Sequence, residues 1–337
     1  MNPMYKFAII GCGRIAPRHA ENIIAIGTLV AVCDTDRNKA DSFAAKYSAK
    51  AYYSIEELLA GEEGVDVVSI CTPNGYHAEH SIKTLQAGKH VLCEKPLCIT
   101  SAAAWQMMET EKFARKELFV VKSTRYNPLL QQLKKLVSTN ELGAIYSFSL
   151  NCFWNRSPAY YTDWRGKNFP DGGTLYTQFS HYIDAMLWVF GDIAEVRGFA
   201  ANKAHANAID FEDTGAAALH MKTGVLGTLN WSVNTYKKNS EIALTVIAEK
   251  GTIGLGGEYL NEIKYQQTDN PIVTGRTNGS NDYGFYKGSM SNHDEVYKNL
   301  VEAMDNPHHP ATRAFDGLKT VEAIEQIYRA VNPLTPQ

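Results

Sequence analysis

The 337-residue sequence predicts an α/β protein of two domains, and three observations predict it. In the first third of the chain, short apolar runs alternate with segments of helical spacing, which is typical of parallel βαβ units. A pair of glycines directly follows the first apolar run. Later runs alternate apolar and polar residues, which indicates a sheet with one exposed face. We therefore expect a doubly wound parallel sheet in residues 1–123 and an α/β domain on an open, mostly antiparallel sheet in residues 124–337.

The first domain divides into strands and helices by the period of its apolar residues. Five apolar runs predict strands at Lys6–Ile10, Leu29–Cys33, Val67–Ile70, His90–Cys93 and Phe119–Lys122. Segments of helical spacing lie at Ile15–Ile26, Arg37–Tyr47, Ile55–Ala60, Tyr76–Gln86 and Ser101–Arg115. Right-handed crossovers bring the carboxyl ends of such strands to one edge of the sheet, where ligands bind in these folds.

The glycine pair predicts a nucleotide site. Gly11, Gly13 and Ala16 form G-x-G-x-x-A between a strand and a helix. The first glycine permits a tight turn, the second lets a pyrophosphate approach the backbone, and the alanine allows close packing of the helix. Asp34 ends the second strand, where its carboxylate can bind a ribose diol. The combination predicts a nicotinamide dinucleotide, with NAD favoured over NADP because Asp34 would repel a 2′-phosphate.

Polar residues at two further strand ends extend the expected cofactor site. Thr72 and Asn74 follow the Val67–Ile70 run, and His77 comes after them near the expected cofactor. His77 and His80 have the i, i+3 spacing of a metal pair, but the local sequence offers no third ligand, so we expect no metal. Beside the glycine turn and Asp34, the predicted cofactor residues are Arg14, Ile15, Thr72, Asn74, His77, Glu94 and Lys95.

The segment CEKPL places Lys95 at the end of the His90–Cys93 strand, between an acid and a proline. A lysine partly removed from water can exchange protons near neutrality, because burial lowers the pKa of its ammonium group. The alternative is a surface lysine beside a surface glutamate. We favour a catalytic Lys95 because of its place at the ligand-binding edge.

The second domain is expected to start near residue 123 and to contain a long helix, Gly172–Phe190. Alternating runs predict strands at Tyr146–Phe153, Glu195–Ala201, Gly215–Met221, Gly227–Val233 and Ile242–Ala248. Thr268–Ser291 is rich in Asn, Gly and Tyr and predicts a long loop. The amphipathic segment Asp316–Val331 predicts a C-terminal helix and is a candidate to pack back on the first domain.

The long helix carries His181 in an otherwise apolar segment. Helical spacing places Thr177, His181 and Asp184 or Ala185 on one face. A lone histidine in such a segment is more often structural, but a lysine at a dinucleotide-binding edge elsewhere in the chain makes His181 a candidate catalytic residue.

An aromatic loop, Phe153–Gly173, precedes this helix and carries Arg156, Trp164 and Arg165. Aromatic faces stack on sugars or bases, and guanidinium groups pair with phosphates or carboxylates. Arg125 and Tyr126 come from the predicted domain junction and could also reach a substrate. The alternative for the loop is an oligomer contact or simple packing on the sheet.

Composition excludes several classes of function. The net charge is −3, so a nucleic-acid footprint is not expected, and no apolar run approaches the roughly 20 residues that cross a bilayer. The sequence MNPMYKFAII lacks the apolar core of a secretory signal. The six cysteines form no CxxC pair, which favours reduced thiols in a cytoplasmic protein.

Taken together, GCGRIA, Asp34, CTPNGYH, CEKPL and GGTLYTQFSHYID resemble the Gfo/Idh/MocA oxidoreductase family over essentially the whole chain. The resemblance implies a Rossmann domain joined to an α/β domain with an open sheet. It implies that Lys95 is the catalytic lysine and His181 the catalytic histidine. Many members carry an aspartate one helical turn before that histidine, where this chain has Thr177, which argues against a polyol or inositol dehydrogenase.

Within the family, IAPRH, SICTPN and the absent aspartate are most similar to UDP-N-acetyl-2-amino-2-deoxyglucuronate dehydrogenases. This resemblance implies NAD-dependent oxidation of the C3 hydroxyl of a UDP-N-acetyl-hexosamine or its uronate. The alternatives are oxidation of another sugar or cyclitol, an NAD-dependent glycosidase with a 3-keto intermediate, and a non-catalytic NAD-sensing regulator. Family habit implies a homo-oligomer, dimer or tetramer, whose partner is a sugar or nucleotide sugar and not a nucleic acid or membrane.

Overall fold

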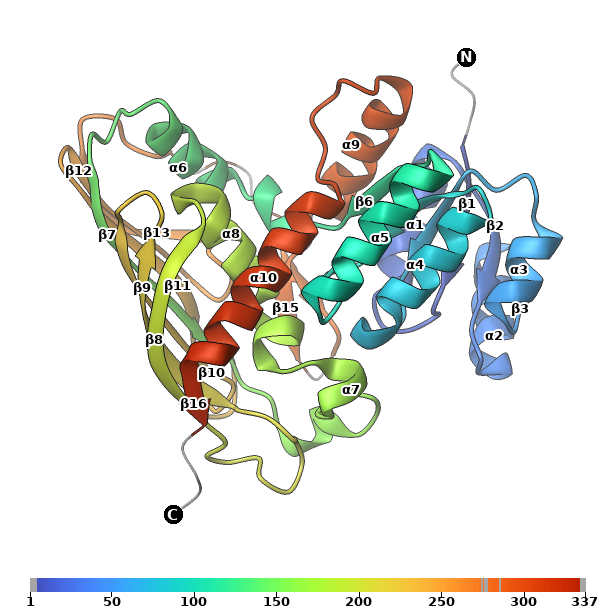
Figure 1. Ribbon diagram of the computed structural model, residues 1–337, viewed down its shortest axis with the longest axis horizontal. Coiled ribbons are helices and arrows are strands. Elements are labelled where there is room, and N and C mark those ends of the chain that lie inside the picture. Colours follow the sequence, from blue (N-terminus) through green and yellow to red (C-terminus); the bar gives the residue numbers. More distant parts are fainter. Residues whose placement is uncertain (1–4, 274, 276–277, 285, 334–337) are drawn as a thin grey trace. The chain divides into compact units, whose positions relative to one another are not determined.

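A computed structural model describes residues 5–273, 275, 278–284 and 286–333 (Figure 1). The chain separates into two compact units. The first comprises residues up to 121 together with 293–321, and the second comprises residues 122–292 together with those from 322 onward. The division along the chain therefore falls at residue 121, close to the expected boundary at 123. The first unit also takes in residues 293–321, which include the start of the segment Asp316–Val331 that was a candidate to pack on the first domain; residues 293–315 were not assigned to it from the sequence.

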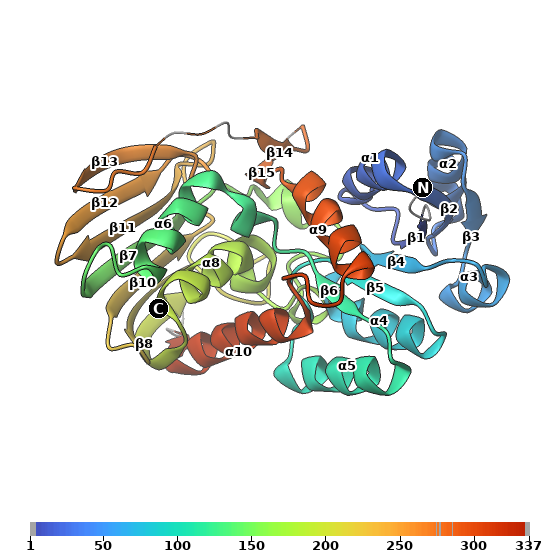
Figure 2. The same cartoon turned by 90° about the horizontal axis from the view of Figure 1, so that it is seen from above.

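The first unit is built on a six-stranded parallel sheet of order β3-β2-β1-β4-β5-β6, the order of a doubly wound fold. Its strands are β1 (Lys6–Ile10), β2 (Thr28–Cys33), β3 (Lys50–Tyr52), β4 (Val67–Ile70), β5 (His90–Cys93) and β6 (Leu118–Val120). Its helices are α1 (Ala16–Ile26), α2 (Arg37–Tyr47), α3 (Ile55–Gly61), α4 (His77–Gln86) and α5 (Ser101–Ala114), with a short 3-10 turn, η1 (Asn74–Tyr76), before α4. In Figure 2, α1 and α2 lie on one side of this sheet and α4 and α5 on the other.

The predicted parallel sheet is confirmed, with small differences at its ends. β1, β4 and β5 have the expected bounds, whereas β6 is Leu118–Val120 and not Phe119–Lys122; the second unit begins at residue 122. The position of β3 was not predicted. It has only three residues, Lys-Ala-Tyr, so it gives too short an apolar run to be recognised.

Residues from the C-terminal part of the chain complete the first unit. Helix α9 (His293–Asp305), which sequence analysis missed, packs on α1. The backbone carbonyl of Thr312 accepts a hydrogen bond from the N–H of Val120 in β6. α10 (Ala314–Ala330) then starts in the first unit, where a Cβ on Gly317 would lie 2.7 Å from Leu97, and it ends in the second.

The second unit is built on an eight-stranded, mostly antiparallel sheet of order β13-β12-β11-β7-β10-β9-β8-β16. Two of its neighbouring pairs, β7 with β10 and β8 with β16, are parallel. Its strands are β7 (Ile145–Phe153), β8 (Ile193–Ala201), β9 (Thr214–Met221), β10 (Leu226–Ser232), β11 (Glu241–Ala248), β12 (Gly251–Gly256), β13 (Glu262–Thr268) and β16 (Val331–Pro333). The open, mostly antiparallel sheet that the sequence predicted is therefore confirmed.

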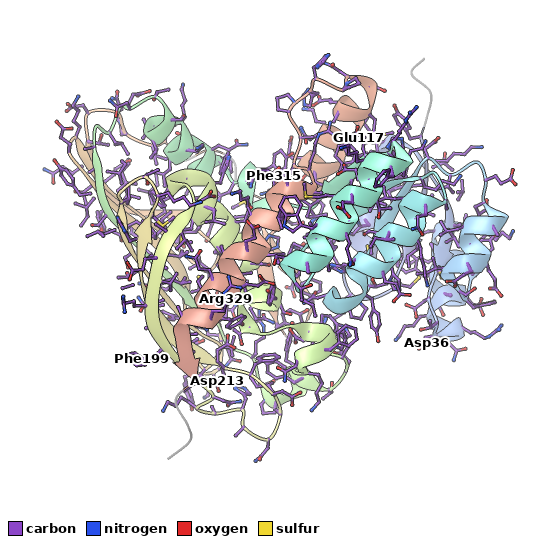
Figure 3. All side chains as sticks on the ribbon, in the orientation of Figure 1. Asp36, Glu117, Phe199, Asp213, Phe315 and Arg329 are labelled. Atoms are coloured by element: carbon purple, nitrogen blue, oxygen red, sulfur yellow. The ribbon has the colours of Figure 1, made fainter. Side chains whose placement is uncertain are left out.

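One face of this sheet is covered by helices and the other is open. α6 (Pro128–Ser138) and α8 (Ser180–Phe190) lie over the covered face in both views (Figures 1 and 2). Phe148 of β7 stacks on Phe190 of α8 with ring centroids 4.4 Å apart. On the opposite face, Phe199 of β8 is exposed, and Figure 3 labels it there.

The predicted helix Gly172–Phe190 is wrong at its start. Gly172 and Gly173 both have positive φ values, 93° and 129°, which an α-helix does not allow. The chain instead forms a short helix α7 (Asn168–Asp171), turns through the two glycines, makes a π-helical turn η4 (Leu175–Phe179) and then enters α8. Single π-turns inside helices occur frequently at functional sites.

The predicted long loop Thr268–Ser291 is also partly wrong. It contains a two-stranded antiparallel sheet of β14 (Ser280–Asp282) and β15 (Lys287–Met290). Residues 274, 276, 277 and 285 of this segment lie outside the described residues, as do residues 1–4, for which a signal was considered. The remaining short elements are η2 (Ser123–Tyr126) and η3 (Pro158–Tyr161).

All six cysteines are buried and unbridged. In the part of the chain that the structure describes, no helix has both the length and the apolar character that a membrane span requires.

Candidate active site

The glycine turn after β1 has the shape that a bound pyrophosphate requires. Gly11 has φ +97°, and a Cβ there would lie 2.7 Å from the carbonyl carbon of Cys71, so no other residue fits without displacing the backbone. Gly13 is exposed, and a Cβ there would meet nothing within 4 Å. Gly11 thus closes the turn against the end of β4, while Gly13 leaves open space above it. Arg14 and Ile15, half-buried, lead from this turn into α1.

Asp34 lies where a ribose-binding carboxylate is expected, directly after β2. Its Oδ2 accepts a 2.9 Å hydrogen bond from the backbone N–H of Cys12, and its Oδ1 accepts one of 2.9 Å from the N–H of Asp36. The open glycine turn and this oriented acid fit a dinucleotide.

The segment after β4 contains Thr72, Asn74 and His77, as predicted. His77 is buried, with Nδ1 2.7 Å from the carbonyl of Pro96 and Nε2 2.8 Å from that of Thr72. Burial lowers the pKa of His77, so the neutral ring donates to one carbonyl at a time. The imidazole therefore links the turn after β4 to the turn after β5. Its predicted contact with the cofactor stays a prediction, as do those of Thr72 and Asn74.

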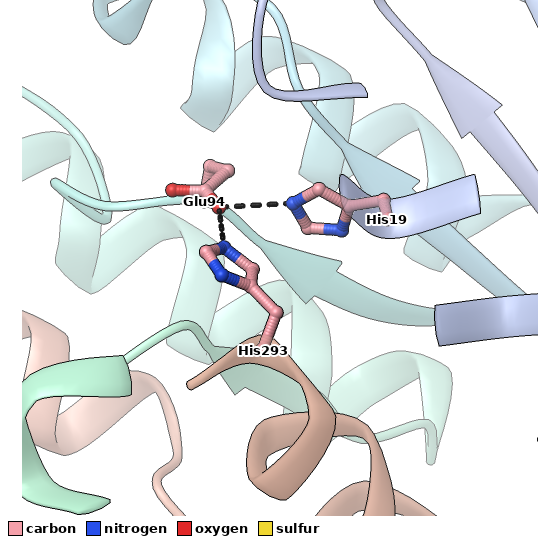
Figure 4. Close-up of side chains that lie close together, drawn as sticks. All are labelled: His19, Glu94 and His293. Carbon is pink, nitrogen blue, oxygen red and sulfur yellow. Dashed lines mark hydrogen bonds and ion pairs between the residues drawn. The ribbon is translucent and has the colours of Figure 1, made fainter. Parts of the chain in front are cut away.

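Glu94 is buried and takes part in a network that the sequence did not reveal (Figure 4). Its Oε1 lies 2.9 Å from Nε2 of His19 in α1 and 3.1 Å from Nε2 of His293 in α9. Its Oε2 accepts a 3.0 Å hydrogen bond from the backbone N–H of Lys95. The carboxylate of Glu94 therefore joins three segments of the first unit immediately before Lys95.

The protonation states of His19 and Glu94 follow from their hydrogen-bond partners. Tyr297 donates to Nδ1 of His19 at 2.7 Å, and burial lowers the pKa of His19, so this ring is neutral and donates through Nε2. Burial opposes ionisation of Glu94, but the hydrogen bonds from His19 and His293 outweigh it and hold the pKa of Glu94 well below its usual value. An ionised carboxylate thus accepts from two imidazoles.

The side chains of His19, Glu94 and His293 are also of types that bind metal ions, and their ligand atoms lie within 4.8 Å of one another. The hydrogen bonds alone account for their positions, because each Nε2 directs a hydrogen at Oε1. The expectation that the protein holds no metal stays a prediction.

Lys95 follows this network and is half-buried. Its backbone is fixed on both sides, since its N–H donates to Glu94 and the carbonyl of Pro96 faces His77. These contacts define the position of the Lys95 Cα at the carboxyl end of β5, from which the side chain extends. Its catalytic role stays a prediction.

In the second unit, His181 lies in the first turn of α8 and is buried. Thr177 lies one turn earlier, inside the π-turn, and is half-buried. Its hydroxyl donates to the carboxylate of Asp171, which also accepts a 2.8 Å hydrogen bond from the N–H of Gly166. No sequence motif indicates this pairing, because the pairing depends on the two-glycine turn between Asp171 and Thr177.

Asp184, on the same helix as His181, binds two cations. Its Oδ1 lies 2.9 Å from Nζ of Lys122, and Arg125 forms a bidentate pair with it at 2.8 and 2.9 Å. Burial opposes ionisation of Asp184, but the two cations outweigh it and keep the pKa of this carboxyl below its usual value. Arg125 therefore anchors the start of the second unit to α8. Its predicted role toward a substrate, like that of half-buried Tyr126, stays a prediction.

The aromatic loop is packed by its own arginines. Arg156 is buried and donates to Gln178 at 2.7 Å and to Asn239 at 3.1 Å, and its guanidinium lies over Trp154 and Tyr286. These contacts hold the loop to the sheet and to the β14–β15 hairpin. The packing alternative therefore accounts for the position of Arg156, and its predicted substrate contact stays a prediction.

Arg165 makes a similar set of contacts. It donates to the hydroxyl of Tyr160 at 3.0 Å, pairs with Asp163 and lies over the ring of Trp164. Trp164 is half-buried. The predicted substrate contacts of Arg165 and Trp164 also stay predictions.

Comparison with known proteins agrees with this geometry. Residues 5–122 match the model of the oxidoreductase family with an NAD-binding Rossmann fold, and residues 130–254 match the GFO/IDH/MocA C-terminal domain. D-glucoside 3-dehydrogenase of Escherichia coli is 30% identical over 74% of this chain and 68% of its own length. The chain belongs to the Gfo/Idh/MocA family of oxidoreductases. It is an NAD-binding enzyme of the sugar and cyclitol dehydrogenase type.

Two solved structures are similar over nearly the whole chain. The WlbA dehydrogenase of Bordetella pertussis, in complex with NADH and UDP-GlcNAcA, has a TM-score of 0.89 and is 32% identical, covering 98% of this chain and 96% of its own. The WlbA dehydrogenase of Chromobacterium violaceum, with the same two ligands, has a TM-score of 0.88 and 32% identity, covering 98% and 94%.

Proposed function

We propose that this protein oxidises the C3 hydroxyl of a UDP-N-acetyl-hexosamine or its uronate, with NAD as the hydride acceptor. The observation that carries the proposal is the full-length similarity to two enzymes crystallised with NADH and UDP-GlcNAcA. Thr177 supports it, because the family aspartate that argues for a cyclitol substrate is absent from this position.

The chain supplies the binding and the proton chemistry, and NAD supplies a hydride acceptor when it is bound. Gly11 and Gly13 would admit the pyrophosphate, and Asp34 would accept hydrogen bonds from the ribose hydroxyls. We propose that Lys95 and His181 act on the proton of the reacting hydroxyl, one orienting the hydroxyl and the other receiving the proton. Such acid–base help contributes about a hundredfold to ten-thousandfold in rate.

The second candidate is oxidation of a sugar that carries no nucleotide. It is favoured by the similarity to D-glucoside 3-dehydrogenase and by glucose-6-phosphate 3-dehydrogenase of Bacillus subtilis, which is 33% identical over 56% of this chain and 54% of its own length. Both names place the oxidation at position 3 of a hexose, as in the first candidate.

A substrate panel tests the two candidates. NADH formation is followed by absorbance with UDP-GlcNAc, UDP-GlcNAcA, glucose 6-phosphate, methyl glucoside and myo-inositol. The first candidate predicts the highest kcat/KM for a UDP-sugar. Equal or higher kcat/KM for a sugar without UDP would favour the second candidate, and release of free sugar without net NADH would favour a glycosidase.

We also propose that the open face of the eight-stranded sheet binds a second copy of this chain. Four large exposed apolar side chains lie on this face, Phe199 of β8, Leu226 of β10, Ile247 of β11 and Tyr265 of β13, among polar residues such as Ser149, Asn151 and Asn230. Several large apolar side chains exposed on one face of an open sheet favour an interface. Light scattering would measure the mass, and Phe199→Glu with Leu226→Glu should shift an oligomer to a monomer. A wild-type monomer at assay concentration would contradict this proposal.

A further inference from the structure

The carboxylate of Glu94 ends a hydrogen-bonded chain of side chains inside the first unit. The hydroxyl of Ser69 in β4 lies 2.8 Å from that of Tyr297 in α9, which lies 2.7 Å from Nδ1 of His19. Nε2 of His19 then contacts Oε1 of Glu94 at 2.9 Å. Ser69, Tyr297 and His19 are 0% exposed, so bulk water does not compete for these bonds. The other oxygen, Oε2, accepts from the N–H of Lys95 at 3.0 Å, so the chain reaches the candidate catalytic lysine.

The carboxylate fixes the direction of every hydrogen in this chain. An ionised carboxylate can only accept, so His19 donates to Glu94 through Nε2 and accepts from Tyr297 at Nδ1. The one hydrogen of the Tyr297 hydroxyl is then used, and its oxygen accepts from Ser69. A single arrangement of hydrogens therefore satisfies the whole chain, and it requires Oε1 of Glu94 to face the histidine.

His293 is a second donor to the same oxygen. Its Nε2 lies 3.1 Å from Oε1 of Glu94, and its ring stands edge-on to that of His19 with centroids 5.4 Å apart (Figure 4). Its Nδ1 is buried and has no hydrogen-bond partner among the residues that the structure describes. Within this part of the chain, the hydrogen-bonding capacity of the His293 side chain is therefore directed at the carboxylate alone.

Two imidazoles on Oε1 leave Oε2 for the backbone of Lys95. Burial opposes ionisation of Glu94, but the hydrogen bonds from His19 and His293 outweigh it and hold the pKa of Glu94 well below its usual value. Loss of one imidazole donor removes part of this restraint, and the N–H of Lys95 then loses a fixed acceptor. A reacting group misplaced by about 1 Å can cost about a hundredfold in rate.

We propose that His293 and His19 are positioning residues for the reaction, because they hold the carboxylate of Glu94 so that Oε2 receives the N–H of Lys95 and thereby places the amine of this lysine. The inference rests on the proposed role of Lys95 and adds to it a residue of α9 that acts through Glu94. It predicts that His293 affects the rate of the chemical step and not the affinity for sugar or cofactor.

Two substitutions of His293 separate its hydrogen bond from its packing. Glutamine carries an amide nitrogen that can donate to Glu94 in place of Nε2, whereas leucine fills similar space without a donor. His293→Leu should lower the single-turnover rate with NAD and the best sugar of the panel by about tenfold or more. Its steady-state KM for the sugar and its dissociation constant for NADH should stay within about twofold of wild type, and His293→Gln should restore the rate to within about threefold.

Asn299→Ala is the matched control on the same helix. The Asn299 side chain donates to the carbonyl of Pro310 at 2.7 Å and lies 3.0 Å from Nε2 of His309. Its loss should lower the melting temperature and leave the single-turnover rate at the wild-type value. A loss of stability in α9 would then not be enough to slow the reaction.

A double-mutant cycle tests whether His293 acts through Lys95. Added to Lys95→Ala, His293→Leu should slow the reaction by no more than about twofold further, because no lysine is left to position. If His293→Leu does not fold, Glu94→Gln takes its place in the cycle, since an amide has one acceptor oxygen for the three donors that face Glu94.

The proposal is overturned if His293→Leu folds, binds NADH and keeps the wild-type rate, or if His293→Gln is as slow as His293→Leu. It is also overturned if the full loss recurs in the Lys95→Ala background, since His293 then acts elsewhere. Failure of the proposed function is seen separately, as a Lys95→Ala protein that keeps the wild-type rate. A wild type that prefers a sugar without UDP leaves the test unchanged, because the variants are then measured with that sugar.

Discussion

The backbone N–H of Cys12 donates a 2.9 Å hydrogen bond to Oδ2 of Asp34, which ties the glycine turn to the end of β2. The N–H of Asp36 donates to the other carboxylate oxygen at 2.9 Å. The carboxylate is thus oriented by two backbone groups before any cofactor binds. Such preorganisation lowers the entropic cost of binding.

Asp34→Ala should weaken NADH binding and reduce the preference for NADH over NADPH. The ribose loses an acceptor, and the negative charge that would repel a 2′-phosphate is removed. Fluorescence titration of the protein with each reduced coenzyme measures both effects.

Asp36→Asn is the matched control for Asp34→Ala. Asp36 is exposed and caps α2 by accepting from the N–H of Lys39, a function that asparagine keeps. The affinities of the Asp36→Asn variant for NADH and NADPH should equal those of the wild type. An unchanged ratio of the two affinities in Asp34→Ala would contradict the role of Asp34.

Alanine substitutions at Gly11 and Gly13 should separate an effect on protein stability from an effect on NADH binding. Gly11→Ala places a Cβ 2.7 Å from the backbone of Cys71 at φ +97°, so the protein should lose stability as well as cofactor binding. Gly13→Ala meets nothing within 4 Å, so its melting temperature should match wild type while NADH binding weakens. Thermal melts with and without NADH test this, and a Gly13→Ala variant that binds NADH normally would show that the pyrophosphate lies elsewhere.

The buried His19 should make the protein less stable in acid. Burial lowers its pKa in the folded state, so His19 takes up a proton on unfolding once the pH falls below about 6.5, the usual value for histidine. Its contribution to the free energy of unfolding is therefore complete above that pH and is lost as the pH falls toward the folded pKa. Urea unfolding at pH 7.5, 6.5 and 5.5 should show the decline.

His19→Gln isolates this effect from that of other histidines. The variant should be less stable at pH 7.5 by about 1–3 kcal/mol, because Glu94 and Tyr297 lose a matched partner, and it should depend less on pH than the wild type. His308→Gln, at an exposed position, should keep the wild-type slope. A His19→Gln protein with the full wild-type slope would refute a neutral buried His19.

Asp184 should be the residue of the second unit least tolerant of neutralisation. Asp184→Asn leaves the buried Lys122 and the partly buried Arg125 without their carboxylate, and we expect a loss of about 3–5 kcal/mol in the free energy of unfolding. Glu195→Gln breaks an exposed pair with Arg197 and should cost less than about 0.5 kcal/mol. Chemical denaturation compares the two, and equal losses would contradict the structural role of Asp184.

The sequence predicted those elements that are specified by a pattern of neighbouring residues. The runs that became β1, β4 and β5 are short and almost wholly apolar because parallel strands are buried on both faces, and their carboxyl ends located Lys95 and Thr72. The glycine turn was predictable for the same reason, since its residues are adjacent in the chain.

Contacts between distant residues could not be predicted in this way. His19 and His293 meet at Glu94 although 274 positions separate the two histidines, and neither lies in a motif that indicates the other. The start of the His181 helix was misplaced because positive φ at Gly172 and Gly173 depends on tertiary packing against Tyr328. Asp171 was overlooked for the same reason, because only that turn brings it to Thr177.

The central claim is that Lys95 and His181 carry the proton chemistry of an NAD-dependent oxidation of a sugar hydroxyl. The most direct test is the rate of NADH formation from UDP-GlcNAcA in a single turnover, measured for wild type, Lys95→Ala and His181→Ala at saturating NAD. We predict that each variant binds NADH with wild-type affinity and loses at least about a hundredfold in rate. A Lys95→Ala protein that keeps its rate, or that loses its rate only because it no longer binds NADH, would contradict the account.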